Sequence, residues 1–98
     1  MINNSSNSQM VHLITYDLRR PLQNYKGLHD EIKKLGSTWW HYLESTWLVD
    51  TALSPQQVWE RLASQIDKDD RVLVIRVTSS HSGWLTQEAW DWINARAY

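Results

Sequence analysis

The chain has 98 residues, of which 42% are hydrophobic, so it can form one domain with a modest core. Ten Lys and Arg residues stand against eleven Asp and Glu, and the formal net charge of −1 lacks the basic excess that is typical of dedicated duplex-binding proteins. With no cysteine, the chain has no disulfide, no thiolate metal site and no thiol nucleophile.

Neither a membrane span nor a signal peptide is predicted. No apolar run approaches the roughly 20 residues that cross a bilayer, and the start MINNSSNSQ has neither a basic region nor an apolar stretch. We therefore expect a cytoplasmic, unexported protein with no membrane partner. Residues 1–9 are mostly Asn, Ser and Gln, which favours a disordered leader before a single domain over residues 10–98.

The first half of the domain is predicted to form a strand, a helix and a hairpin. VHLITYDL (residues 11–18) is β-rich, and Pro21 ends this strand because proline cannot donate to a ladder. Gly36 then marks the end of a helix, whose apolar residues recur at helical spacing: Tyr25, Leu28, Ile32 and Leu35. TWWHYL and TWLVDT are both β-rich, so a hairpin is predicted with its turn at Glu44 and Ser45.

The second half is predicted to add a helix, a strand and a terminal helix. Ser54, Pro55 and Gln57 fit a capping box with proline at the first helical position. The apolar stripe of that helix is Val58, Trp59, Leu62, Ala63 and Ile66. RVLVIRVT (residues 71–78) is β-rich, and Thr86 can cap the last helix. Its apolar face is Leu85, Ala89, Trp92 and Ile93.

This order of elements, β-α-β-β-α-β with an added C-terminal helix, predicts an α+β, ferredoxin-like fold. Four antiparallel strands then carry two helices on one face. Aliphatic residues occur on both sides of the first and last strands, so the second face also needs a cover. The terminal helix, a second subunit or a ligand can supply it. Homodimerisation is the commonest solution, and the expected interface is Val11, Leu13, Val72 and Val74.

Asp17, at the end of the predicted first strand, is the candidate catalytic and metal-binding residue. An Asp in this position is as often a turn former or a helix cap. If two copies meet across a two-fold axis, however, their repulsion favours a raised pKa or a bound divalent cation, for which Mg²⁺ is the hard-oxygen choice. The four histidines lack zinc-binding spacing, so a histidine metal cluster is not predicted.

Basic residues near Asp17 are the candidate nucleic-acid contacts. Arg19, Arg20 and Lys26 give this part of the chain a local positive bias that can contact phosphates. A solvated helical face is the commoner explanation of such charges.

The segment STWWHYLESTWLVDT (residues 37–51) holds three of the seven tryptophans. RNA-recognition modules share the predicted topology and stack bases on aromatic residues of their strands. The third strand lacks the signature of those modules, and alternate residues of a strand point to opposite faces. We therefore expect these aromatic residues mainly to pack the core and a sheet-face interface.

HLITYDLRRP, KKLGSTWWHYLESTWLVDT, SPQQVWERL and DDRVLVIRV together resemble the small bacterial proteins labelled SinR-like, over about residues 11–93. More distantly, the layout resembles the ferredoxin-like second protein of the CRISPR adaptation complex. That wider family implies a homodimer and, in some members, metal-dependent cleavage of nucleic acid by an Asp at the position of Asp17. This chain departs from it in its balanced charge, and in a predicted terminal helix where a strand is often exchanged between subunits.

We expect a small homodimeric binding or scaffold protein that associates with nucleic acid or with another protein. One alternative is a metal-dependent endonuclease in which Asp17 from two subunits holds Mg²⁺. The other is a single-stranded RNA-binding module that uses the hairpin aromatics. Whether the protein is an enzyme stays open at this level. Hydrolase triads, nucleotide triphosphatases and dehydrogenases are not indicated, because their motifs do not occur.

Overall fold

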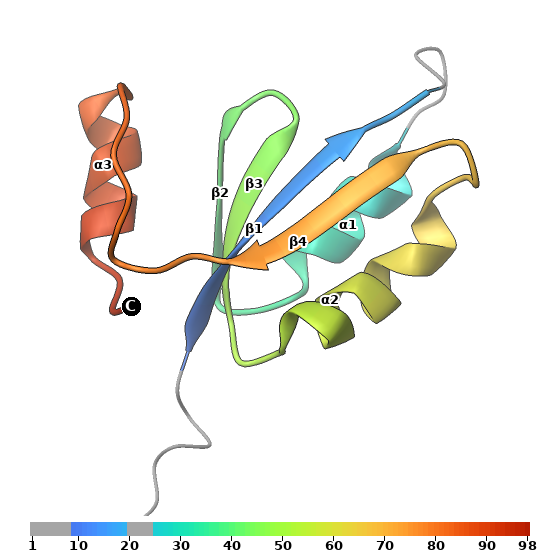
Figure 1. Ribbon diagram of the computed structural model, residues 1–98, viewed down its shortest axis with the longest axis horizontal. Helices are drawn as coiled ribbons and strands as arrows, with labels where there is room; N and C mark the ends of the chain where they lie inside the picture. The colour runs from blue at the N-terminus through green and yellow to red at the C-terminus, as the bar shows by residue number, and fades with distance from the viewer. Residues whose placement is uncertain (1–8, 20–24) are drawn as a thin grey trace, which may run out of the picture.

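Four strands and three α-helices make up the part of the chain that the computed structural model describes, residues 9–19 and 25–98 (Figure 1). In chain order they are β1 (Met10–Asp17), α1 (Lys26–Lys33), β2 (Thr38–Leu43), β3 (Thr46–Thr51), α2 (Pro55–Leu62), β4 (Arg71–Arg76) and α3 (Gln87–Asn94), with a short 3-10 turn, η2 (Ala63–Gln65), after α2. This is the predicted order of elements. Except for Gln9, the predicted leader lies outside the described residues, as do Arg20 and Pro21.

The strands form one antiparallel sheet in the order β2-β3-β1-β4, which is the ferredoxin-like arrangement. Residues that pair directly across strands point to the same face of a sheet, so the register defines rows that cross all four strands. One row consists of Leu43, Thr46, Thr15 and Leu73. The next row consists of Trp40, Leu48, Leu13 and Ile75.

Helices α1 and α2 cover the face of the sheet opposite to these rows. Leu28 and Ile32 of α1 pack with Val58 and Leu62 of α2 in one buried cluster, and Ile14 of β1 lies in the same cluster. The start of α2 has the predicted capping box: the Ser54 hydroxyl accepts from the Gln57 N–H at 3.1 Å, and Oε1 of Gln57 accepts from the Ser54 N–H at 2.8 Å. Local sequence signals therefore fix where α2 begins.

Helix α3 lies on the other side of the sheet from α1 and α2 (Figure 1). Its Ala89 and Ile93 form a second buried cluster with Trp40 and Leu48, and the Trp40 indole N–H donates to the Ala89 carbonyl at 3.1 Å. Thr86 caps the helix by accepting from the Ala89 N–H at 3.2 Å, as predicted. The terminal helix therefore covers part of the face of the sheet opposite to α1 and α2.

The four residues expected at a dimer interface do not share a face. Val72 and Val74 are half-buried against the α1 and α2 side, whereas Val11 and Leu13 belong to the cluster beneath α3. The reason is the register between β1 and β4, in which Leu13 pairs with Ile75. Leu73 and Ile75 of β4 therefore point to the α3 side.

The segment of residues 37–51 forms the predicted hairpin, with its turn at Glu44 and Ser45. Trp40 and Trp47 are both buried, and they lie in the clusters on opposite sides of the sheet. The period of two in a strand explains this division. In the part of the chain that the structure describes, no helix is both long enough and apolar enough to span a membrane.

Candidate functional site at the end of strand β1

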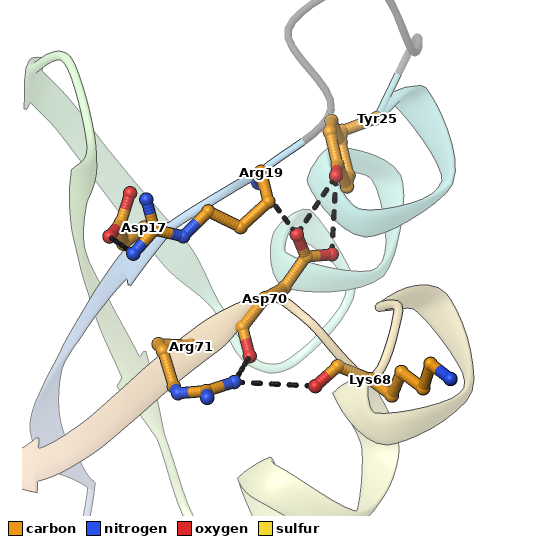
Figure 2. Close-up of polar contacts among 6 residues, drawn as sticks. All are labelled: Asp17, Arg19, Tyr25, Lys68, Asp70 and Arg71. Carbon is orange, nitrogen blue, oxygen red and sulfur yellow. Dashed lines mark hydrogen bonds and ion pairs between the residues drawn. The ribbon is translucent and has the colours of Figure 1, made fainter.

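Asp17 ends β1 and forms a surface ion pair with Arg19 (Figure 2). The closest approach is 3.2 Å between Asp17 Oδ2 and Arg19 Nη2, and both side chains are more than half exposed. Arg71 of β4 lies opposite Asp17 in the register of the two strands. Its side chain does not bond to Asp17: Nη1 donates to the backbone carbonyls of Lys68 and Asp70, at 3.3 and 2.9 Å. Because exposed ion pairs contribute little free energy, Asp17 remains accessible to a ligand.

Asp70 is the buried acid of this region, and it fixes the end of β1 in place (Figure 2). Its carboxylate accepts the backbone N–H of Arg19 at 2.8 Å, the hydroxyl of Tyr25 at 3.0 Å and the backbone N–H of Asp67 at 2.9 Å. These bonds join the segment after β1 to the start of α1 and to the turn before β4. Asp70 therefore has a structural role, which the sequence did not indicate because DKDD (residues 67–70) has the composition of an ordinary charged turn.

The predicted metal site would need ligands from more than one chain. Among residues 9–19 and 25–98, no group of three or more His, Asp or Glu side chains is placed to hold a metal ion. Asp17 supplies a hard carboxylate oxygen, which suits Mg²⁺. The two-subunit arrangement expected from the sequence stays a prediction.

A hollow of about 290 Å³ lies beside Asp17, between the end of β1, helix α1 and the β2-β3 turn. It is lined by Tyr16, Asp17, Leu18, His29, Glu44 and Ser45. At its base the Trp47 indole N–H donates to the Tyr16 hydroxyl oxygen at 2.9 Å, and that oxygen lies 3.2 Å from Nε2 of His29. The indole can only donate, so the Tyr16 oxygen is the acceptor in that bond, and the imidazole tautomer decides which of Tyr16 and His29 donates in the other.

Two titratable groups in this hollow have shifted pKa values. Burial lowers the pKa of His29, and the nearby His41 and Lys33 lower it further, against a smaller opposing effect of Asp30. Burial likewise raises the pKa of Tyr16. At neutral pH the hollow therefore contains a neutral imidazole and a neutral phenol, and Asp17 is among the residues that line it. Perturbed groups in a concave site are a common sign of function.

His29 is a site residue that the sequence analysis missed. The histidines were tested only for zinc-binding spacing, and His29 lies next to Leu28 in the predicted helix. A signal was present, because Tyr25, His29 and Ile32 share one face of a helix at i, i+4 and i+7 spacing. That face packs against β1 and brings His29 to Tyr16.

Of the three predicted nucleic-acid contacts, the two that the structure describes each lie against a carboxylate. Arg19 is paired with Asp17, and Nζ of Lys26 lies 2.6 Å from Oδ2 of Asp30 within α1. The Lys26 contact also lowers the pKa of Asp30. Arg20 lies outside the described residues.

The hairpin aromatics do not assemble a broad stacking surface. His41 stacks on the buried Trp47, with ring centroids 3.8 Å apart, and Trp39 is 43% exposed beside them with Nζ of Lys33 at 4.9 Å from its ring centroid. Tyr42 packs near Trp40, on the opposite side of the sheet from Trp47. An RNA-recognition module instead stacks two or three bases on one face.

Known protein families add no assignment to this geometry. No family model matches the chain. The site is therefore defined by what the structure brings together: a carboxylate at the end of β1 and a hydrogen-bonded tyrosine and histidine in the adjoining hollow.

Proposed function

We propose that the protein is a homodimeric scaffold that associates through the α3 side of its sheet. The observation that carries this proposal is the apolar surface that α3 leaves uncovered. Leu43 is 47% exposed, Leu73 56% and Ile75 51%, while Trp40 and Leu48 of the same face are buried under the helix. Apolar surface that stays in water forgoes roughly 25 cal/mol of burial free energy per Å², so this surface favours the binding of a partner.

The composition of the uncovered row supports a second copy as the partner. It consists of Leu43, Thr46, Thr15 and Leu73, and therefore has the same apolar-Thr-Thr-apolar order in both directions. A two-fold interface needs such self-complementarity. Oγ1 of Thr15 lies 3.2 Å from Oγ1 of Thr46, so one hydroxyl donates to the other and burying the row costs less than burying two separate hydroxyls.

A dimer also duplicates the site at the end of β1, so that it presents two copies of the Asp17 hollow to one partner. Two linked weak sites bind a bivalent partner more tightly than either site alone. Because Arg19 and Lys26 are already paired with carboxylates, long-range attraction to duplex nucleic acid is weak. This favours a protein partner for the scaffold, and nucleic acid is the competing outcome.

Light scattering on a gel-filtration column tests the interface. We expect the wild type to elute with twice the 11.6 kDa mass of the chain, and Ile75→Asp to elute as a folded monomer, because a buried unpaired carboxylate disfavours association. Ser64→Asp adds the same charge at an exposed position after α2 and should remain dimeric. A dimeric Ile75→Asp protein would exclude this face as the interface.

A metal-dependent nuclease is the second candidate, and one observation favours it: a neutral His29 lies in the hollow beside Asp17. Asp17 would hold the cation, which would supply Lewis-acid polarisation of a phosphodiester. In the tautomer whose Nε2–H donates to the Tyr16 oxygen, Nδ1 of His29 could accept a proton from an attacking water, as a general base does.

The nuclease candidate is tested with wild type, Asp17→Asn and His29→Gln on single-stranded and duplex DNA and RNA, with Mg²⁺, Mn²⁺ or a chelator. The scaffold proposal predicts no metal-dependent difference between these proteins. Cleavage that needs metal and disappears in a still dimeric Asp17→Asn protein would establish the nuclease instead. Equal traces of cleavage in all three proteins would identify a contaminant.

A further inference from the structure

Trp84 is the most exposed large apolar side chain that the structure describes, at 98% of its full accessible area. It lies in residues 77–86, which connect β4 to α3 and run alongside that helix (Figure 1). Its neighbour Leu85 packs against the cluster beneath α3, so the backbone at Trp84 is held in place while the indole projects into solvent. Tryptophan is the side chain most often found as a binding hot spot.

The surroundings of Trp84 are also apolar. It borders a hollow of about 390 Å³ that is lined by Tyr42, Leu43, Leu85 and Thr86. Leu43 is an end residue of the uncovered row at the β2 edge, and Leu73 is the residue at the opposite end, on β4. Trp84 thus stands at one edge of the proposed dimer face, and the exposed aliphatic side chains of β4 lie at the other edge.

We propose that Trp84 anchors the dimer by packing against Leu73 of the second copy. This inference rests on the proposed dimer function and names the contact within it. In this arrangement the two-fold axis runs parallel to the strands, above the boundary between β3 and β1. It reverses the order of the strands in the second copy. The end of each strand stays at the same end of the dimer in both copies. The β2 edge of each copy then faces the β4 edge of the other, with Trp84 at the level of Leu73.

The same symmetry accounts for the partial cover that α3 provides. In the row of Trp40, Leu48, Leu13 and Ile75, the helix buries the two residues at the β2 edge and leaves Ile75 half exposed. The α3 helix of the second copy lies over Ile75 in the proposed arrangement. Each sheet is then covered from β2 to β1 by its own helix, and at β4 by the helix of its partner.

Area and charge are consistent with this contact. Two tryptophans that bury roughly 150 to 250 Å² each supply about 300 to 500 Å² of the roughly 1,200 Å² that a stable interface needs. The arrangement also brings Glu44, in the hairpin turn, to the end of β4 where Arg71 lies. Among the described residues, Glu44 has no ion pair of its own and Arg71 contacts only backbone carbonyls, so the two charges are complementary.

Trp84→Ala tests the anchor, with Trp39→Ala as a matched control. We expect Trp84→Ala to raise the dimer dissociation constant by about 30-fold or more, as loss of a hot spot does. Its circular dichroism and monomer unfolding should match the wild type, because the exposed indole contributes little to the fold. Trp39 is partly exposed on the other side of the sheet, so Trp39→Ala should keep the wild-type dissociation constant.

Cross-linking locates the contact, since the chain has no cysteine of its own. Gly83→Cys and Leu73→Cys proteins are mixed and treated with a short bis-maleimide. A Cβ at Gly83 has no neighbour closer than 4.0 Å, so that change is tolerated. We expect a mixed cross-linked dimer in higher yield than from a mixture of Gly83→Cys with Ser64→Cys.

The outcomes separate this inference from the dimer proposal. A wild-type dimer that Trp84→Ala does not weaken, or that gives no excess Gly83-Leu73 cross-link, overturns the anchor and leaves the dimer proposal standing. A wild type that is monomeric at every concentration overturns both. A weakened Trp84→Ala dimer together with the specific cross-link supports both.

Discussion

At the scale of single residues, the imidazole of His29 is kept neutral by the same packing that brings it to Tyr16. Burial between α1 and β1 is the largest cause of its lowered pKa, and the positive charge of Lys33 and a neighbouring His41 act in the same direction. A neutral ring can accept the Tyr16 hydroxyl proton, whereas an imidazolium cannot. Protonation of His29 therefore leaves Nε2 able only to donate to the Tyr16 oxygen, which also accepts from Trp47.

The lowered pKa of His29 makes stability depend on pH. In the unfolded chain this histidine titrates near its ordinary pKa of about 6.5. Just below that pH, the unfolded state therefore binds more protons at His29 than the folded state does. The His29 contribution to the free energy of unfolding is complete above about pH 6.5 and is lost as the pH falls below it. We expect thermal melts of the wild type to show a decrease in Tm from pH 7 to pH 5, and His29→Gln to reduce that decrease.

The control for this pH series is His81→Gln, which removes an exposed histidine from the segment before α3. It should retain the wild-type slope of Tm against pH. If His29→Gln and the wild type had the same slope, the lowered pKa of His29 would be refuted.

At the scale of elements, α3 is held by packing as well as by polar contacts. Ile93 is buried beneath it, and Arg96 just beyond the helix lies 3.3 Å from Asp50 and 4.2 Å from the ring centroid of Trp92. We expect Ile93→Ala to lower the free energy of unfolding by about 2 to 5 kcal/mol, because it leaves a cavity. Urea denaturation measures this loss. Asn94→Ala, on an exposed position of the same helix, should change stability by less than about 0.5 kcal/mol.

The capping box of α2 gives a second element-scale prediction. Ser54→Ala removes the acceptor for the Gln57 N–H and should lower the free energy of unfolding by about 1 kcal/mol. Ser64→Ala, in η2 after α2, removes a hydroxyl with no capping role and should have a much smaller effect. Equal losses in the two variants, measured by urea denaturation, would argue against a capping contribution from Ser54.

The elements that the sequence predicted well are those with local signals. The start of α2, the cap of α3 and the turn at Glu44 and Ser45 depend on residues a few positions apart, so they could be located from the chain alone. The stripe predicted for α2 was too long: Trp59 is 39% exposed, and Ala63 lies beyond the end of the helix. Helical periodicity gives the face of a helix but not the extent to which neighbouring elements cover it.

Features that depend on distant pairing could not be predicted in this way. Strands β1 and β4 are far apart in the chain, and their register decides that Ile75, not Val74, shares a face with Leu13. A shift of one residue exchanges the two faces of a strand, and no local signal fixes it. The contact between Tyr16 and His29 likewise requires α1 to pack on β1, so the sequence indicated Asp17 but not the hollow beside it.

At the scale of the whole molecule, the account rests on a sheet whose two faces are covered unequally. Two helices cover one face, whereas on the other face α3 covers β2, β3 and part of β1 and leaves Leu73 and Ile75 of β4 exposed. In the proposed dimer, a second copy related by a two-fold axis would complete that cover with its own α3 and with Trp84. This arrangement would need no exchange of strands between subunits.

Sedimentation equilibrium of the wild-type protein, across loading concentrations from the nanomolar to the high micromolar range, tests this central claim most directly. The account predicts a reversible rise of the weight-average mass from the 11.6 kDa of one chain to twice that value, with no larger species. The upper limit follows because a two-fold interface closes on itself. A mass that stays at one chain throughout the range, or that continues to rise beyond two chains, would contradict it.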